Sequence, residues 1–477
     1  PPSSIGKFGG DTDNWIWPRH TGDFSMFRVY ASKDNKPAAY SPQNVPYRPK
    51  KHFAISTKGV KEGDFTMIYG FPGNTQEYIL SDAVAYIAER SDPAKIAIRT
   101  GRLDIISKAQ ESDPALRIFY AARHASIANA WKKWQGEVLG IERRGTVASK
   151  RAYEEAFDAW AQDKPRYRNV VTQLKAEYAR IADPYFAREI TLETLGALPI
   201  KYPAKERAEA VFARRKATER ALYSLQFGEY ARRCPAQFQI PEFLDGVARY
   251  GSPEAFAEEI FTQVWNGSDT TAATALRSGT KRMLDHITWL TGTKSLRNLN
   301  SKRLNELYTT YIKGLREWDA ERAFYPDANL TLRVAYGTVA GYEYADGEYH
   351  KPQTTLDGII AKDNPEIYDY DIPQTLRDRY ASKEYGRWAA TIGGHKTVPV
   401  CFLATNHTTG GNSGSPVLNA SGELIGINFD RTWRSTMSDV AFDPSICRNI
   451  AVDIRYVLFV VDRIGGAGYL LKEMKLK

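Results

Sequence analysis

The chain has 477 residues, of which 43% are hydrophobic and 25% charged, and its formal net charge is +9. This length predicts two or three domains, and the composition is that of a globular protein. No stretch approaches the roughly 20 uninterrupted apolar residues of a membrane span, so we expect no membrane helix. Lys and Arg are interleaved with Asp and Glu, as in residues 207–216, which favours solvated helix faces over a nucleic-acid-binding surface.

The three cysteines, Cys234, Cys401 and Cys447, show no CxxC spacing, so we expect no metal site. In an oxidising compartment one disulfide could form, and the sequence does not select the pair. Cys401 lies within an apolar run and is expected to be a buried free thiol. The chain starts without Met and without a secretory pattern, so we interpret it as a mature or truncated product.

The first segment, residues 7–24, combines two tryptophans, a histidine, three glycines and five charged side chains. Rigid aromatic walls with polar groups between them suit a ligand pocket better than a core strand. Strands are predicted at residues 24–30, 52–56 and 64–69, the last followed by a turn at Gly70. These short strands predict part of a β-barrel.

From about residue 80 the apolar period changes to that of helices. Tyr153, Phe157 and Trp160 recur at i, i+4 and i+7, and residues 304–318 hold one apolar face over four turns. Residues 78–330 are therefore interpreted as one all-helical domain, whose aromatic residues mostly form its core.

Beyond residue 330 the strand pattern returns. Residues 450–464 are strongly apolar and are expected to run into a terminal helix. The sequence thus predicts an α+β protein, a β-type domain interrupted by an inserted helical domain. The further predicted strands are residues 330–336, 397–404, 416–419 and 423–429.

A candidate nucleophile, Ser413, lies between the last predicted strands, in Thr408–Pro416. A nucleophilic serine needs an exposed hydroxyl on a tight turn, with backbone N–H groups aimed at the developing oxyanion. Gly411 and Gly414 permit such a turn because glycine tolerates positive φ. The alternative is a hairpin loop without chemistry.

Two segments carry a family resemblance: Gly411-Asn-Ser-Gly-Ser-Pro416, and Asn14-Trp-Ile-Trp-Pro-Arg-His-Thr-Gly-Asp-Phe24. Together they resemble the bacterial serine peptidases that include dipeptidyl peptidases 7 and 11. The resemblance implies a chymotrypsin-like double β-barrel with a large helical insertion. Residues 1–77 and 331–477 would then form the peptidase domain, its N-terminal portion missing, and residues 78–330 the insertion. It implies neither a cofactor nor a metal.

The resemblance assigns Ser413 as the nucleophile and Asp23 as the aspartate that orients the catalytic histidine. The N–H groups of Gly411 and Ser413 are expected to form the oxyanion hole. The family's catalytic histidine precedes the aspartate, so we expect it in a segment before residue 1. His20 and His407 are interpreted as structural.

The resemblance also assigns residues that hold the free N-terminus of a peptide substrate: Asn14, Trp15, Arg19, Asn129 and Asp430. Such a site needs a carboxylate for the ammonium and neutral amides for the adjacent backbone. Asp430 supplies the charge, and Asn14 and Asn129 supply the amides. Without the resemblance, Asn129 would be interpreted as part of a solvated helix face.

Arg431 follows Asp430, where a chymotrypsin-like fold builds the wall of its S1 pocket. In the family, arginine here goes with Asp or Glu at P1, and a guanidinium matches a carboxylate bidentately. By itself Arg431 could equally be a surface ion-pair residue.

The sequence-based hypothesis is a serine exopeptidase that releases N-terminal dipeptides with Asp or Glu at P1. One alternative is a dipeptidyl peptidase of the same family that prefers hydrophobic P1 residues. Another is a catalytically silent peptide-binding protein on a peptidase fold. The resemblance further implies a homodimer in the bacterial periplasm or at the cell surface, and the interleaved charges predict no nucleic-acid partner.

Overall fold

The computed structural model describes residues 1–267, 270–292 and 301–477. A β-rich unit comprises residues 1–74, 328–438 and 442–477, and a helical unit comprises residues 75–327 and 439–441. The predicted mixture of helix and sheet is confirmed. None of the helices within the described ranges combines the length and apolar character that a bilayer crossing requires.

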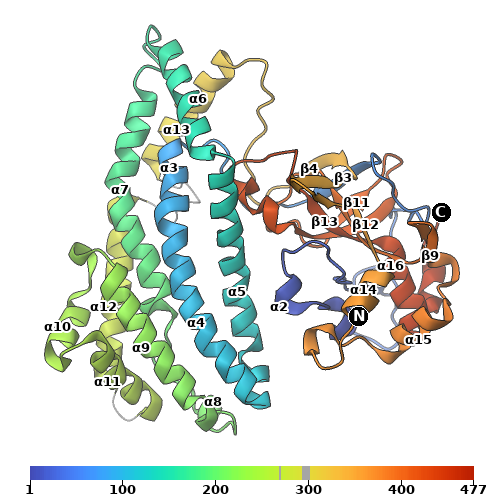
Figure 1. Cartoon of the computed structure of the whole chain (residues 1–477), viewed down its shortest axis with the longest axis horizontal. Coiled ribbons are helices and arrows are strands. Elements are labelled where there is room, and N and C mark those ends of the chain that lie inside the picture. The colour runs from blue at the N-terminus through green and yellow to red at the C-terminus, as the bar shows by residue number, and fades with distance from the viewer. Residues whose placement is uncertain (268–269, 293–300) are drawn as a thin grey trace. The chain divides into compact units, whose positions relative to one another are not determined.

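The main sheet of the β-rich unit is antiparallel, in the order β4–β3–β11–β12–β13–β10–β7. Figure 1 labels β3, β4, β11, β12 and β13 of this sheet. A bridge between Val339 and Ala404 joins the end of β4 to β10, so six strands close on themselves around a buried apolar core. The seven strands are β3 Phe65–Gly70, β4 Arg333–Thr338, β7 Gln353–Thr355, β10 Pro399–Ala404, β11 Ser415–Leu418, β12 Leu424–Arg431 and β13 Asn449–Asp453.

The other elements of this unit are short. They are α1 Ser3–Gly6, α2 Gly10–Asp13, β1 Tyr30–Ala31, β2 Val45–Pro46, β5 Tyr342–Ala345, β6 Glu348–His350, α14 Leu356–Lys362, α15 Gln374–Ser382, β8 Ala390–Ile392, β9 His395–Thr397 and α16 Ile454–Phe459. The predicted C-terminal helix is confirmed by α16, and Cys401 is a buried free thiol, as expected. Cys234 and Cys447 are also free, so the three cysteines form no disulfide.

The strand predictions succeed around Ser413 and fail near the N-terminus. Residues 64–69 correspond to β3, but within residues 24–30 only Tyr30 is in a strand, and residues 52–56 form only a bridge at Ile55. Phe27 is 87% exposed. β-Propensity reflects packing against neighbouring strands, and among the described residues only the end of this segment, Val29 and Tyr30, meets one, the short strand β2.

In the helical unit, long helices lie side by side, α4 against α5 and α7 against α12 (Figure 1). The predicted aromatic core is confirmed: Phe157 on α6 packs against Tyr311 and Trp318 on α13, with ring centroids 5.1 and 5.8 Å away. The helices are α3 Ser81–Ala85, α4 Asp92–Ser112, α5 Pro114–Arg143, α6 Thr146–Ala161, α7 Val170–Glu193, α8 Ala204–Arg207, α9 Lys216–Arg233, α10 Pro241–Tyr250, α11 Pro253–Asn266, α12 Thr271–Thr291 and α13 Lys302–Trp318.

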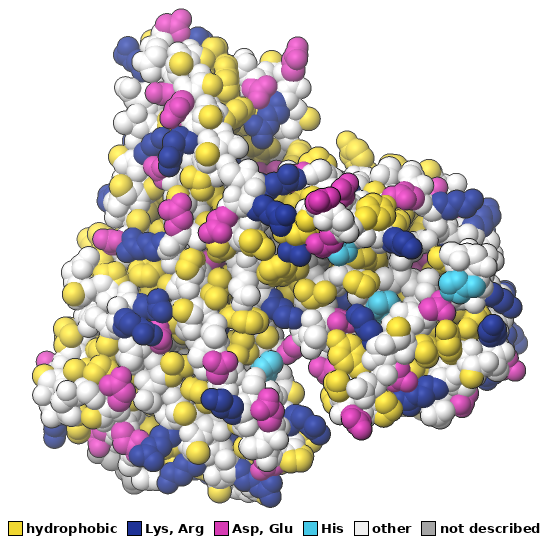
Figure 2. Space-filling view, in the orientation of Figure 1, with side chains coloured by type: hydrophobic (Ala, Val, Ile, Leu, Met, Phe, Trp, Pro, Cys, Tyr) yellow, Lys and Arg dark blue, Asp and Glu magenta, His cyan; other side chains and the backbone are white. Residues whose placement is uncertain are grey.

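Charged side chains are interspersed on the face drawn in Figure 2, with Lys and Arg next to Asp and Glu on both units. The interleaving seen in the sequence is therefore present on the folded surface as well. Mixed charge of this kind suits solvated helix faces.

The two chain segments that enter and leave the helical unit are tied to each other. Thr75 Oγ1 and Glu77 N donate hydrogen bonds to Asp327 Oδ1 (2.7 and 3.0 Å), and Tyr325 OH donates to Glu77 Oε2 (2.7 Å). Burial, reinforced by the Asp327 charge, raises the pKa of Glu77 to about 7. Burial lowers the pKa of Lys150, which donates to the Glu77 carbonyl, to about 8.

We expect Glu77→Gln to change how stability depends on pH. Because the folded-state pKa of Glu77 lies above the value of 4.5 for a free glutamate, the folded protein binds the extra proton between these values. The contribution of this bound proton to the stability of the folded protein is complete below pH 4.5 and is lost as the pH rises through 7. The wild type should therefore lose on the order of 3 kcal/mol more than Glu77→Gln between pH 4.5 and 8.

Urea unfolding at several pH values measures this difference. The control is Glu155→Gln, which removes an exposed carboxylate from α6 of the same unit. Parallel pH profiles for the wild type and Glu77→Gln would contradict the prediction.

Candidate active site

Ser413 lies exposed on the turn that connects β10 to β11. On either side, Gly411 (φ 106°) and Gly414 (φ 82°) adopt left-handed backbone conformations, which other residues reach only with strain. Asn412 between them is buried, and its Oδ1 accepts a hydrogen bond from Thr409 N (3.1 Å). A buried asparagine thus fixes the turn from inside while the serine faces solvent.

Two N–H groups remain available within residues 411–414. The N–H of Gly414 donates to Asn428 O (2.8 Å), whereas those of Gly411 and Ser413 donate to no residue in the described ranges. Ser413 Oγ donates to Phe429 O (3.3 Å). The turn therefore presents a hydroxyl together with two unengaged backbone donors, which is what stabilisation of an oxyanion requires.

Asp430 lies at the end of β12, after an irregularity in the β12–β13 register between Asn428 and Asp430. Its Oδ2 accepts hydrogen bonds from Arg19 Nη1 (2.8 Å) and Trp15 N (3.2 Å), and its Oδ1 accepts one from Arg431 N (2.8 Å). The side chains of Arg19 and Asp430 are only 7% and 10% exposed. The carboxylate is thus desolvated, oriented and paired.

The tryptophan segment, residues 14–19, is held against this strand end. Trp15 has a positive φ of 67°, and its carbonyl accepts a hydrogen bond from Trp433 N (2.5 Å). Trp17 Nε1 donates to Lys351 O (3.0 Å). Asn14 is half-buried, and its side-chain amide has no hydrogen-bond partner among the described residues. Its amide is therefore free to contact a bound molecule.

Arg431 is buried beside the nucleophile turn. Its Nη1 donates to Ser438 Oγ (2.8 Å) and to Thr408 O (3.3 Å), and its guanidinium lies 5.6 Å from the centre of the Trp15 ring. The structure therefore brings Arg431 close to two predicted parts of the site, the tryptophan segment and the segment that begins at Thr408. Sequence analysis missed Ser438, because a fold-back of residues 433–439 brings it here and no motif marks it.

Asp23 is exposed, and no described residue donates a hydrogen bond to its carboxylate. Restricted solvation raises the pKa of Asp23; the Asp430 carboxylate raises it further, and Arg19 opposes both. Asp23 therefore lies within electrostatic reach of the Arg19–Asp430 pair, with its acceptor atoms open.

Neither nearby histidine contacts Ser413. His20 is buried against Gly358; burial, with Lys362 and Arg19, lowers its pKa to about 3, so its imidazole is neutral. His407 Nε2 contacts Ser438 O (3.0 Å), and the ring stacks on Phe442 at 4.3 Å. These contacts agree with the interpretation of both residues as structural.

Asn129, the remaining predicted site residue, is exposed on α5 of the helical unit. The structure therefore groups Asn14, Trp15, Arg19, Asp430 and Arg431 within the β-rich unit, and Asn129 belongs to the other unit.

An exposed serine beside unengaged N–H groups, on a turn between two strands, is the arrangement that serine hydrolases use. The sequence model of Peptidase S46 matches residues 1–198 and 204–476. The chain therefore belongs to the peptidase S46 family.

Individual relatives are similar over the whole chain. The Asp/Glu-specific dipeptidyl-peptidase of Capnocytophaga gingivalis is 41% identical, with all of this chain and 72% of the relative covered. Dipeptidyl-peptidase 7 of Phocaeicola vulgatus is 34% identical, with 100% and 71% covered. The crystal structure of Porphyromonas endodontalis DPP11 in complex with the dipeptide Arg-Glu superposes with a TM-score of 0.82 at 33% identity, covering 100% of this chain and 74% of that one.

We expect Gly411→Ala to disrupt the nucleophile turn. A Cβ at this position would lie 2.4 Å from Phe71 O and 2.8 Å from Gly73 N, in addition to the strain of φ 106°. The backbone must move, so labelling of Ser413 by a fluorophosphonate probe should fall about tenfold or more, with a loss of about 1–3 kcal/mol in stability.

Gly422→Ala is the matched control. Its φ of 71° is also positive, but a Cβ there meets nothing within 4 Å. It should cost about 1–2 kcal/mol of strain and leave labelling unchanged. Equal labelling of both variants would show that the close approach at Gly411 does not shape the turn.

Proposed function

We propose that the protein is a serine-type dipeptidyl peptidase that releases N-terminal dipeptides with Asp or Glu at P1. The observation that carries this proposal is the buried Arg431 guanidinium beside the Ser413 turn, with the Asp430 carboxylate one residue away. A positive group for the P1 side chain and a negative group for the substrate ammonium then occupy adjacent positions. The names of the Asp/Glu-specific relatives support the same specificity.

Catalysis proceeds through an acyl-enzyme in this proposal. Ser413 attacks the scissile carbonyl as its proton passes to the base, and the N–H groups of Gly411 and Ser413 stabilise the oxyanion. The scissile C–N bond then breaks, the base returns the proton to the leaving amine, and water hydrolyses the acyl-enzyme to release the dipeptide. Asp23, whose carboxylate is open to a partner, orients the histidine that acts as base. In the family resemblance the catalytic histidine precedes the aspartate, so we assign the base to a histidine before residue 1. His20 and His407 make their contacts elsewhere, with Gly358 and with Ser438 O.

The free N-terminus of the substrate is held by Asp430, Asn14, Trp15, Arg19 and Asn129. Asp430 provides the counter-charge, and Arg19 fixes the orientation of that carboxylate through the 2.8 Å pair. The unengaged amide of Asn14 suits the first peptide group of the substrate.

The finer architecture and the setting follow from the family resemblance. The proposal includes a chymotrypsin-like double β-barrel, to which the six closed strands contribute one barrel. Residues 1–77 and 331–477 form its peptidase domain, and residues 78–330 form the insertion. It also includes a homodimer and a location in the bacterial periplasm or at the cell surface.

The decisive experiment compares fluorogenic dipeptides with the full-length protein. One ends in Asp with a free amino terminus, one in Leu with a free terminus, and one in Asp with a blocked terminus. We expect rapid cleavage of the free aspartyl substrate alone. Faster cleavage of the leucyl substrate would favour a dipeptidyl peptidase for hydrophobic P1 residues. Absence of cleavage, together with failure of Ser413 to react with the probe, would favour a peptide-binding protein.

Arg431→Gly should lower kcat/KM for the aspartyl substrate about 100-fold or more, because a desolvated carboxylate would lose its charged partner. Cleavage of the leucyl substrate should rise. The control is Arg434→Gly, which removes another guanidinium from the same segment, one that lies 3.6 Å from the Tyr344 ring centre. If Arg431→Gly keeps the P1 preference of the wild type, Arg431 does not determine P1 specificity.

Asp430→Asn should raise KM for free-terminus substrates and reduce kcat/KM by about 100-fold, because the substrate ammonium would lose its counter-charge. Labelling of Ser413 by the fluorophosphonate probe should remain, since Asp430 makes no contact with its hydroxyl. If probe labelling falls as far as peptide cleavage, Asp430 supports the fold of the site rather than binding of the N-terminus.

A further inference from the structure

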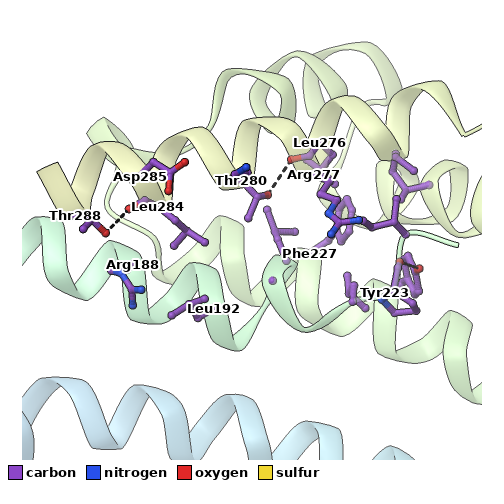
Figure 3. A pocket seen from close by; sticks show the side chains of 18 residues that line it. Arg188, Leu192, Tyr223, Phe227, Leu276, Arg277, Thr280, Leu284, Asp285 and Thr288 are labelled. Carbon is purple, nitrogen blue, oxygen red and sulfur yellow. Dashed lines mark hydrogen bonds between the residues drawn. The ribbon is translucent and has the colours of Figure 1, made fainter. Parts of the chain in front are cut away.

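The helical unit contains a cavity of about 640 Å³. It lies between α7, α9 and α12, and residues 195–200 and Ile260 complete its wall (Figure 3). This volume falls within the range of small-molecule binding sites, roughly 300–1,000 Å³, whereas close-packed interiors contain few voids larger than a water molecule. The cavity is therefore large enough for a ligand and is separate from the residues of the candidate active site.

Most of the wall is apolar. Figure 3 shows Leu192 of α7 and Phe227 of α9 on one side, with Leu276 and Leu284 of α12 opposite. The hydroxyls of Thr280 and Thr288 on α12 donate to carbonyls one turn earlier in their own helix (2.9 and 2.8 Å). These two hydroxyls therefore offer a ligand no free donor, and contact with this part of the wall favours an apolar chain.

The charged groups of the wall are mainly cationic. The wall contains three cations, Arg188, Arg277 and Lys281, and one carboxylate, Asp285; of these, only Arg188 is half-buried and the other three are exposed. Within the described ranges none of these four side chains forms an ion pair or a hydrogen bond. Arg188 Nε is buried without a hydrogen-bond partner in the same part of the chain. A buried guanidinium nitrogen without a partner is costly, so this site favours an anion.

The acidic residues of α7 do not supply that anion. Glu189 accepts hydrogen bonds from Tyr86 and Ser91 (2.7 and 2.8 Å), and Glu193 pairs with Arg99 (2.7 Å). The two carboxylates that follow Arg188 on α7 are thus engaged with residues outside this helix. The cationic charge at the cavity remains uncompensated by its own helix.

We propose that this cavity binds an aliphatic monocarboxylate, a molecule with one carboxylate and an unbranched apolar chain. The carboxylate is held by Arg188 together with the cations of α12, and the chain lies along the leucine and phenylalanine side chains. Neither half of such a ligand is enough for tight binding. A short carboxylate makes no contact with the apolar wall, and an uncharged chain leaves Arg188 unpaired.

Isothermal titration calorimetry of the full-length protein with decanoate, below its micelle concentration, tests the proposal. Decanol carries the same chain without the charge, and acetate carries the charge without the chain. We expect saturable binding of decanoate, at least tenfold weaker binding of decanol, and no detectable heat with acetate. Equal binding of decanol and decanoate, or tighter binding of an acidic peptide than of decanoate, would overturn the proposal.

Variants locate the site. Arg188→Gln should weaken decanoate binding about tenfold or more, as expected for loss of a charge-assisted hydrogen bond. Arg180→Gln, on the same helix, removes an exposed arginine that already pairs with Glu177 (2.6 Å) and should have no effect. Arg277→Gln removes the second cation of the proposed site. Because Arg277 is exposed, this change should leave the fold intact.

Thr288→Phe keeps every charge and fills part of the cavity, and it should abolish decanoate binding by removing the space for the chain. Circular dichroism confirms that each variant is folded. Decanoate binding that survives both Arg188→Gln and Thr288→Phe would place the ligand elsewhere and refute the proposal.

Discussion

The ion pair between Arg19 and Asp430 is the contact on which the arrangement of the site depends. It joins residues 411 positions apart, and both side chains are almost fully buried. Burying two charges costs several kcal/mol unless their remaining hydrogen-bonding groups are satisfied. Here Asp430 also accepts from the N–H groups of Trp15 and Arg431, and Arg19 also donates to Asp13 O and Thr21 Oγ1. The pair therefore anchors the tryptophan segment to the end of β12.

This ion pair brings negatively and positively charged side chains close together in the site. The Asp23 and Asp430 carboxylates lie near Arg19, close enough for their charges to influence one another. Arg431 follows immediately along β12 with a buried guanidinium. Opposite charges on neighbouring residues favour a molecule that is itself dipolar, and they exclude molecules that present the charges in reverse.

Sequence reasoning succeeded where the pattern is local. The paired glycines around Ser413 predicted a left-handed turn, and the apolar runs beside it predicted β10, β11 and β12. It failed for residues 24–30, because strand formation needs a neighbouring strand that propensity alone cannot supply. The partners of Arg431 were equally inaccessible: Ser438 and Thr408 reach it only through tertiary folding. The placement of Asn14, Trp15 and Arg19 came from a motif rather than from any periodic pattern.

The hydrogen bond between Thr75 and Asp327 (2.7 Å) means that the helical unit begins and ends at almost the same point. Residues 75–327 therefore form one long insertion between β3 and β4, and the two ends of this insertion are held together. The entropy of closing a loop grows only logarithmically with its length. Helices in this insertion can therefore lengthen, shorten or be exchanged with little effect on the register of β3 and β4, so the two units can accumulate sequence changes at independent rates.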